Sequence, residues 1–211
     1  MPHDLGSLLD PAHTAVVTSE CQNGVVGTEA IFPQLAHAAA GAVEQIARLV
    51  SAAHSADAHV VHCLALRRPD AKGTNSNARL FAAAGRAPVV LAPGSHAAAL
   101  LPALGPRPDD LVLTRLHGLS PMAGTDLDAV LRNLEVTTIV VAGVSVNVAI
   151  TNLVMDAVNL GYQVVLPRDA VAGTPVEYAD AVIDNTLSLL ATVTTVDDVL
   201  RAWSSEFLTD R

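Results

Sequence analysis

Short, uninterrupted runs of β-branched and other apolar residues recur along the chain, and segments with helical periodicity separate them. The runs cover residues 14–19, 59–64, 110–114, 137–142, 162–166 and 191–193. Strands that are apolar at every position, rather than at alternate positions, are typical of a parallel sheet covered on both faces. The sequence therefore predicts an α/β fold: a doubly wound, mostly parallel six-stranded sheet with helices on both faces.

The segments between these runs predict the helices that cover the sheet. They span residues 34–54, 78–84, 125–134, 147–160 and 174–190, and a last helix follows Thr195. Thr174 and Pro175 predict an N-cap and a first helical residue, a position that accommodates proline well. Because no repeat, low-complexity segment or linker interrupts the alternation, we expect residues 1–211 to form a single domain.

The balance of charged and apolar residues limits what the chain binds. Its formal net charge of -9 argues against broad binding to nucleic acid or to an anionic membrane. Hydrophobic residues make up 51% of the 211 residues, but no run has the length that spans a bilayer. We expect that part of the surplus apolar surface forms a subunit interface, in a homodimer or homotetramer.

The N-terminal segment and the cysteines indicate a cytoplasmic location. The first ten residues lack the basic and apolar segments of a secretory signal. Cys21 and Cys63 provide no disulfide framework, which suits a reducing compartment. No set of His and Asp residues has the spacing of metal ligands, so we expect neither a metal nor a cofactor.

Polar residues follow the predicted strands, at the edge of the sheet where ligands bind in doubly wound folds. They are Glu20, Gln22 and Asn23; Arg67 and Arg68; Arg115 and His117; Ser145 and Asn147; and Arg168 and Asp169. Residues 67–94 are rich in Arg, Pro, Asn and Gly, which favours a functional loop over a plain connection. We expect a binding site for a small anion at this edge, with Arg67 or Arg68 contributing to it.

Several motifs at these strand ends resemble those of one known family. They are Glu20–Asn23 (ECQN), Arg115 with the Gly124-Thr125 that follows it, Gly143–Ala149 (GVSVNVA), Gly161-Tyr162 and Asp169-Ala170. On these motifs the chain, from about residue 14 to residue 195, resembles the isochorismatase-like (cysteine hydrolase) superfamily. The resemblance implies a Rossmann-like, three-layer hydrolase with a small-molecule substrate.

The resemblance also implies that this chain is a divergent member. An aspartate, a lysine and a nucleophilic cysteine occupy the family positions that correspond to Glu20, Arg115 and Ala149. Alanine cannot form a thioester, so a covalent intermediate at residue 149 is excluded. Isochorismatases also lack this cysteine and resemble general-acid catalysts, which implies Glu20 as the acid/base and Arg115 as an electrostatic clamp.

The remaining site residues that we predict bind the substrate: Gln22, Arg67, His117, Val144, Ser145 and Asn147. The resemblance implies a cis peptide between Val144 and Ser145, which would turn backbone amides toward the substrate. With Ala149 near the start of a helix, these amides would form an anion or oxyanion site. The substrate implied by this set is a small anionic metabolite.

Two other readings stay open. The chain could be a non-catalytic relative that binds a small ligand, with Glu20 locked in an ion pair and the pocket collapsed. Cys63 could instead serve as a displaced nucleophile, whereas Cys21 is expected to be a small buried hydrophobe.

Overall fold

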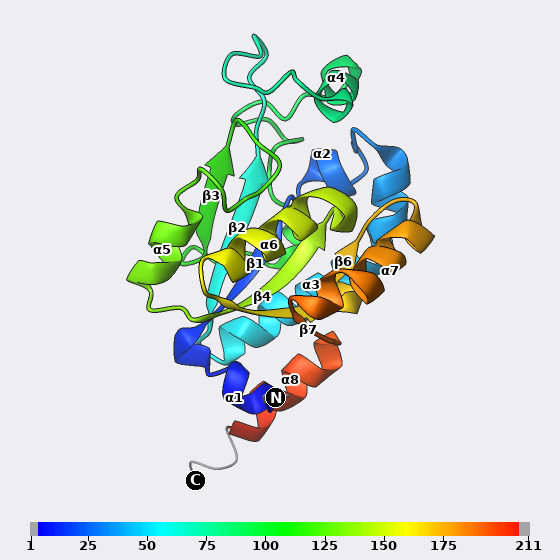
Figure 1. Ribbon diagram of the computed structural model, residues 1–211. Helices are drawn as coiled ribbons and strands as arrows, with labels where there is room; N and C mark the ends of the chain where they lie inside the picture. Colours follow the sequence, from blue (N-terminus) through cyan, green and yellow to red (C-terminus); the bar gives the residue numbers. More distant parts are fainter. Residues whose placement is uncertain (1–3, 207–211) are drawn as a thin grey trace.

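A parallel sheet of seven strands forms the centre of the computed structural model, which describes residues 4–206 (Figure 1). Six strands follow one another in the order β3-β2-β1-β4-β5-β7, and the short β6 pairs with β4 off this path. Their bounds are β1 Thr14–Ser19, β2 His59–Ala65, β3 Leu111–Arg115, β4 Thr138–Val144, β5 Gln163–Pro167, β6 Val171–Ala172 and β7 Thr192–Thr194. Each registered pair of these strands is parallel, as predicted.

The six predicted strands are all present, and each boundary lies within two residues of its predicted place. The seventh strand, β6, was not predicted. It contains two residues, too few for a run of apolar residues to be recognised in the sequence. The number of strands is therefore seven rather than six, while the predicted α/β, doubly wound architecture is confirmed.

Helices cover both faces of the sheet, and the residues of β4 show why its sequence is continuously apolar. Ile139 and Val141 pack in one core and Val140 and Ala142 in the other, because successive side chains point to opposite faces. The first core is completed by α5 (Leu127–Asn133), α6 (Thr151–Asn159) and α7 (Val176–Asn185). The second is completed by α1 (Leu5–Leu8), α3 (Pro33–Ser55) and α8 (Val196–Glu206). Among residues 4–206, no helix combines the length and apolarity needed to cross a membrane.

Two helices begin differently from what the sequence predicted. The helix expected from residue 147 begins as a π-helical turn, η3 (Val146–Ile150), which continues into α6. The peptide between Thr174 and Pro175 is cis, and α7 begins one residue after the proline. Pro175 is therefore the N-cap of α7 and not its first helical residue.

The sheet reverses its winding between β1 and β4, because the chain moves from β1 outward to β3 on one side and from β4 to β7 on the other. Ligands bind outside the carboxyl ends of the strands at such a reversal. Gly143 lets the two strands meet there: a Cβ on it would lie 2.2 Å from the carbonyl oxygen of Ser19. Its φ of 108° is also one that side chains disfavour.

The connection from β2 to β3 rises above the carboxyl ends of the strands (Figure 1). It carries α4 (Arg79–Arg86) and η2 (Pro102–Leu104), while α2 (Asn23–Val26) follows β1 at the same edge. A hydrogen bond of 2.8 Å from the Gly118 amide to Asn75 Oδ1 ties this connection to the loop after β3. The connection therefore forms a roof over the place where the fold predicts a ligand.

Candidate active site

A cavity of about 180 Å³ opens at the carboxyl ends of four adjacent strands, under the roof formed by α4. Glu20 follows β1, Ala65 ends β2, Arg115 ends β3, and Ser145 and Ala149 follow β4; all five line the cavity. The remaining lining is mostly apolar and includes Phe32, Leu35, Leu80, Phe81 and Val148. The structure thus brings together the three residues predicted to be catalytic, Glu20, Arg115 and Ala149, with Ser145.

The backbone of Glu20 turns its carboxylate toward this cavity. Its φ is 58°, a left-handed conformation that costs a residue with a side chain about 1–2 kcal/mol. The Glu20 amide donates to the carbonyl of Cys63 at 2.8 Å, and the Glu20 carbonyl accepts from the Gln22 amide at 2.8 Å. These bonds fix the turn, and the side chain keeps 20% of its surface exposed.

Arg115 lies against Glu20 and is more deeply buried, with 5% of its side chain exposed. Its Nη2 donates to Glu20 Oε1 and lies 3.5 Å from the carbonyl oxygen of Leu119. Its Nε and Nη1 are buried and have no hydrogen-bond partner among the described residues. Buried N–H groups on a cation are costly when unsatisfied, so an acceptor on a ligand would stabilise them.

The segment after β4 supplies the far wall of the cavity. The peptide between Val144 and Ser145 is cis, as the resemblance implied. Ser145, Val148 and Ala149 line the cavity and lie at the start of the helix that runs through α6. The first turn of a helix has amides without a helical acceptor, which suits it to a negative charge. No side chain at residue 149 can attack a substrate covalently.

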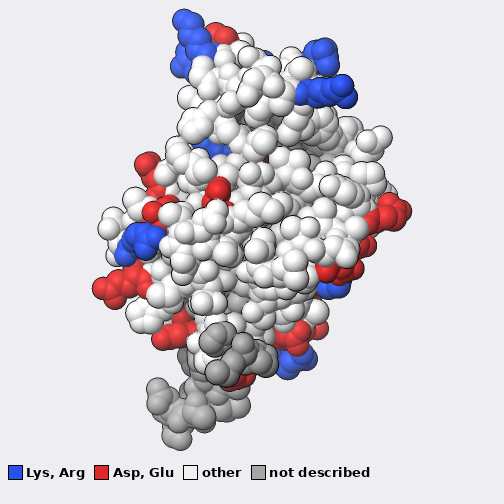
Figure 2. Space-filling model, in the orientation of Figure 1, with Lys and Arg blue, Asp and Glu red and all other residues white. Residues whose placement is uncertain are grey.

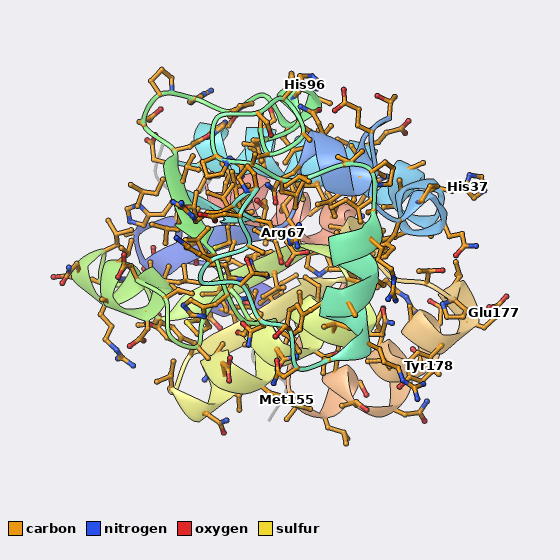
Figure 3. The ribbon with its side chains drawn as sticks, turned by 90° about the horizontal axis from the view of Figure 1, so that it is seen from above. His37, Arg67, His96, Met155, Glu177 and Tyr178 are labelled. Atoms are coloured by element: carbon orange, nitrogen blue, oxygen red, sulfur yellow. The ribbon has the colours of Figure 1, made fainter. Side chains whose placement is uncertain are left out.

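A second compartment of about 120 Å³ lies beside the first and shares Ala65, Phe81 and Arg115 with it. Arg67 and His117, both predicted to bind substrate, line this second compartment rather than the cavity of Glu20. Seen from above the sheet, Arg67 lies near the middle of the molecule, while the other labelled side chains lie at its rim (Figure 3). The amide of Arg67 donates to the carbonyl of Leu91 at 2.8 Å, which ties the start of the β2–β3 connection to a later part of it.

Gln22 does not lie at the cavity, although we predicted that it binds substrate. Its side chain is fully buried and bonds to three backbone groups. Nε2 donates to the carbonyls of Ala65 at 2.9 Å and Ala98 at 2.8 Å, and Oε1 accepts from the Ala65 amide at 2.9 Å. Gln22 therefore joins β2 to the segment before β3, a structural task that its place after β1 did not reveal.

Val144 and Asn147 also lie away from the lining of the cavity. Val144 is buried with 1% exposure in an apolar cluster beneath the loops. The Asn147 side chain points to the loop before α7, where its Nδ2 lies 3.4 Å from the carbonyl oxygen of Thr174. The contribution of residues 144–149 to the cavity therefore comes from Ser145, Val148 and Ala149.

The charged residues after β5 and Arg68 have partners elsewhere. Arg168 lies 3.4 Å from Asp184, and Asp169 accepts from the amide of Val196 at 2.9 Å. Arg68 is exposed and makes two hydrogen bonds to Asp70, at 2.9 and 2.8 Å. Four strands rather than five therefore supply the site.

Both cysteines are buried thiols outside the lining of the Glu20 cavity. Burial raises the pKa of Cys21 to about 12, and the Glu20 charge adds to this shift. Burial likewise raises the pKa of Cys63 to about 12, although the Arg115 charge opposes it. A thiol with such a pKa is almost entirely protonated at neutral pH and is a poor nucleophile, which argues against Cys63 as a displaced nucleophile.

Two groups of lining residues were not predicted. Phe32, Leu80 and Phe81 form apolar walls, and Thr74 lines the second compartment with Arg67. The composition of residues 67–94 indicated a functional loop, but it could not show which side chains turn inward. In the described part of the chain, no three His, Cys, Asp or Glu residues come close enough together to hold a metal ion.

A known family of proteins matches most of this sequence. An isochorismatase domain model matches residues 14–198. A protein of Escherichia coli described as an uncharacterized isochorismatase family protein, YecD, is 32% identical over 79 residues, 37% of this chain and 42% of that protein. The match thus spans less than half of that relative.

Solved structures extend the similarity over nearly the whole chain. A cysteine hydrolase from Pseudomonas syringae is 26% identical, with a TM-score of 0.80 over 94% of this chain and 95% of that one. An isochorismatase family protein from Desulfovibrio vulgaris is 27% identical, with a TM-score of 0.77 over 90% of this chain and 98% of that one. N-carbamoylsarcosine amidase from Thermoplasma acidophilum, 21% identical, shares the fold, with a TM-score of 0.70 over 87% of this chain and 96% of that one. Because the family model covers most of the sequence, this chain belongs to the isochorismatase-like hydrolase family.

Proposed function

We propose that this chain hydrolyses a small anionic metabolite by carboxylic acid/base catalysis, without a covalent cysteine intermediate. The observation that carries the proposal is the position of Glu20, whose partly exposed carboxylate borders an open cavity of about 180 Å³. A sealed carboxylate would have no access to water or substrate. Here the Glu20 carboxylate, the buried Arg115 guanidinium and the start of the helix after β4 border the same cavity.

With an enol ether, protonated Glu20 gives its proton to the vinyl carbon, and the resulting carboxylate takes a proton from the water that adds to the cation. With an ester or an amide, Glu20 acts as a base and then as an acid. The ionised carboxylate takes a proton from a water molecule while the water oxygen forms a bond to the substrate. The negative charge that develops on the substrate is stabilised by Arg115 and by the backbone amides of Ser145 and Ala149, which line the cavity. The bond to the leaving group then breaks, and Glu20 returns the proton to that group. No step requires a side-chain nucleophile at residue 149.

The experiment measures hydrolysis of a panel of anionic esters, amides and enol ethers by the full chain and by Glu20→Gln. Removal of a general acid/base lowers the rate by about 10²- to 10⁴-fold, so we expect at least a hundredfold fall in kcat with the ligand affinity retained. Glu29→Gln is the matched control, because Glu29 is outside the cavity lining and bonds to His96 at 3.1 Å. Equal rates for Glu20→Gln and the wild type would rule out the mechanism.

The second candidate is a ligand-binding relative without catalysis, and the Glu20–Arg115 ion pair favours it. A carboxylate that stays paired cannot move to a water molecule or a leaving group. This candidate predicts ligand binding with no turnover of any substrate in the panel, by the wild type as well as by Glu20→Gln. The open cavity leads us to prefer the enzyme.

We also propose that residues 1–211 act as one cytoplasmic domain in a homodimer or homotetramer. Support comes from large apolar side chains on α6, on the residue that follows it and on α7 that remain exposed: Met155, Val158, Leu160, Val176 and Tyr178. Met155 and Tyr178 lie at the rim of the molecule (Figure 3). Sedimentation of the full chain at several concentrations tests this assembly, and a monomer at all of them would contradict it.

A further inference from the structure

We infer that the second compartment, lined by Arg67, Thr74 and Arg115, binds the carboxylate of the substrate. The apolar body of the substrate would then occupy the cavity of Glu20. The inference rests on the proposed function for the chemistry at Glu20 and specifies which class of anion the site takes. The ligand would be a small carboxylic acid with an apolar body, and its hydrolysable bond would lie near Glu20.

Buried polar atoms without partners carry this inference. In the described residues, seven buried side-chain atoms have no hydrogen-bond partner, and four of them belong to residues that line this one compartment. They are Arg67 Nε, Thr74 Oγ1, and Nε and Nη1 of Arg115. All four atoms can donate a hydrogen bond. Because buried polar groups in folded proteins are nearly always satisfied, such a concentration of donors indicates a missing acceptor.

The charges point to the same kind of ligand. Arg67 and Arg115 line the compartment together, whereas Glu20, the ion-pair partner of Arg115, lines the neighbouring cavity. Among the described residues, no acidic side chain lines the compartment of about 120 Å³, so Arg67 borders it without a carboxylate partner there. A planar carboxylate fits guanidinium donors well and would neutralise one of these cations.

The surrounding surface favours the approach of an anion. Residues 67–86 contain five of the 12 Lys and Arg residues, Arg67, Arg68, Lys72, Arg79 and Arg86, and a single acid, Asp70. The blue side chains at the top of Figure 2 lie over this segment, while red side chains are spread along the flanks of the molecule. In a chain with a net charge of -9, this local excess of cations would attract an anion to the roof of the site.

The walls of the Glu20 cavity define the other half of the ligand. Phe32, Leu35, Phe81 and Val148 face this cavity, and Phe81 also borders the compartment of Arg67. Since both spaces share Arg115 and Phe81, a ligand can extend from one into the other. Burial of an apolar body against these side chains would be favourable, because its surface would be removed from water. A second charged group in the same place would be unfavourable, because it would lose water and would lie next to the Glu20 carboxylate.

Isothermal titration calorimetry with benzoate and with its neutral isostere benzamide tests the compartment by binding alone. We expect benzoate to bind the full-length wild type and to lose at least tenfold in affinity in Arg67→Gln. Thr74→Val should weaken benzoate about threefold. Arg68→Gln, the matched control with the same change of charge, should stay within twofold, because Arg68 points away to Asp70. The weaker affinity of benzamide should be unchanged in all three variants.

Three results would overturn the inference. They are no binding of benzoate to the wild type at millimolar concentration, equal affinity for benzoate and benzamide, or equal losses in Arg67→Gln and Arg68→Gln. Thermal unfolding of each variant shows whether it is folded, and Thr74→Val keeps the test decisive if Arg67→Gln is not. Loss of turnover in Glu20→Gln concerns the proposed function only, so a chain that binds benzoate but hydrolyses nothing refutes the function and retains the compartment.

Discussion

Arg115 and Glu20 are 95 residues apart in the chain, yet Nη2 of Arg115 donates a hydrogen bond to Oε1 of Glu20 at the carboxyl edge of the sheet. Glu20 follows β1 and Arg115 ends β3, two strands that are separated by β2. The pair joins a deeply buried cation to a carboxylate that borders a cavity. Its two members therefore contribute to stability and, as we propose, to catalysis.

Removal of the cation should destabilise the protein strongly. Arg115→Met leaves the Glu20 carboxylate partly buried without its partner, and we expect the free energy of unfolding to fall by about 3 kcal/mol. The double variant Glu20→Gln/Arg115→Met should be more stable than Arg115→Met, because no unpaired charge remains. Urea unfolding measures both, and Arg68→Met, at an exposed ion pair, should behave as the wild type. A double variant less stable than Arg115→Met would contradict the pairing.

Restoring a thiol at residue 149 should create a reactive cysteine. Ala149 borders the cavity beside Glu20, whereas Cys21 and Cys63 are buried thiols whose pKa burial raises to about 12. We expect iodoacetamide to label Ala149→Cys at pH 7.5 at least tenfold faster than the folded wild type, as followed by mass spectrometry. Peptide mapping should place the label at residue 149. Equal labelling of the wild type would show that a native thiol is accessible.

Substitution of Gln22 should reduce stability rather than affinity for ligand. Gln22→Leu removes three hydrogen bonds and leaves the Ala65 amide and the carbonyls of Ala65 and Ala98 without their partner. Unsatisfied buried groups cost about 1–3 kcal/mol each, and we expect a total loss of about 3 kcal/mol in urea unfolding. Gln34→Leu, at an exposed position of α3, is the control. If the folded Gln22→Leu variant keeps its stability but loses benzoate binding, Gln22 contacts the ligand after all.

The buried histidine on β2 should make the protein sensitive to mild acid. His62 lies 2.8 Å from Thr18 Oγ1 and 3.4 Å from Asp110 Oδ2, and Asp110 also bonds to His54 at 2.7 Å. Burial lowers the pKa of His62 from its ordinary value of 6.5, although Asp110 opposes this shift. The unfolded chain therefore binds a proton more readily than the folded chain. The contribution of His62 to the free energy of unfolding is therefore fully present at pH values above 6.5. It decreases as the pH falls below 6.5, by at most about 1.4 kcal/mol per pH unit.

This dependence can be measured by urea unfolding at pH 7.5 and 5.5. The wild type should lose more stability than His62→Gln between these values, by at most about 1.4 kcal/mol, because glutamine does not titrate. His37→Gln, on the exposed side of α3, should lose as much as the wild type. Asp110 does not titrate in this pH range. Burial raises the pKa of its carboxyl, but hydrogen bonds from the Arg107 amide and His54 outweigh this effect and lower the pKa from 3.8, so the contribution of Asp110 to stability is lost only in stronger acid. Equal losses in the wild type and His62→Gln would refute the assignment to His62.

The sequence predicted most of the fold because the information is local. Continuous apolar runs such as residues 137–142 reveal strands buried on both faces, and their alternation with helical periods leads to a parallel sheet. The two-residue β6 and the cis peptide before Pro175 were missed. β6 is defined by its pairing with β4, a distant part of the chain, and no periodicity in the sequence marks it.

For the site, the sequence by itself determined the chemical inventory: a glutamate, an arginine and an alanine at three strand ends, and therefore no covalent step at residue 149. Only the tertiary structure decided which of these polar residues face the ligand. Gln22 turned inward to bond with backbone groups, whereas Thr74, on a distant loop, came to line the compartment of Arg67. The physical reason is that residue type fixes what a side chain can donate or accept, while its neighbours across the sheet and under the roof decide whether that capacity is already used.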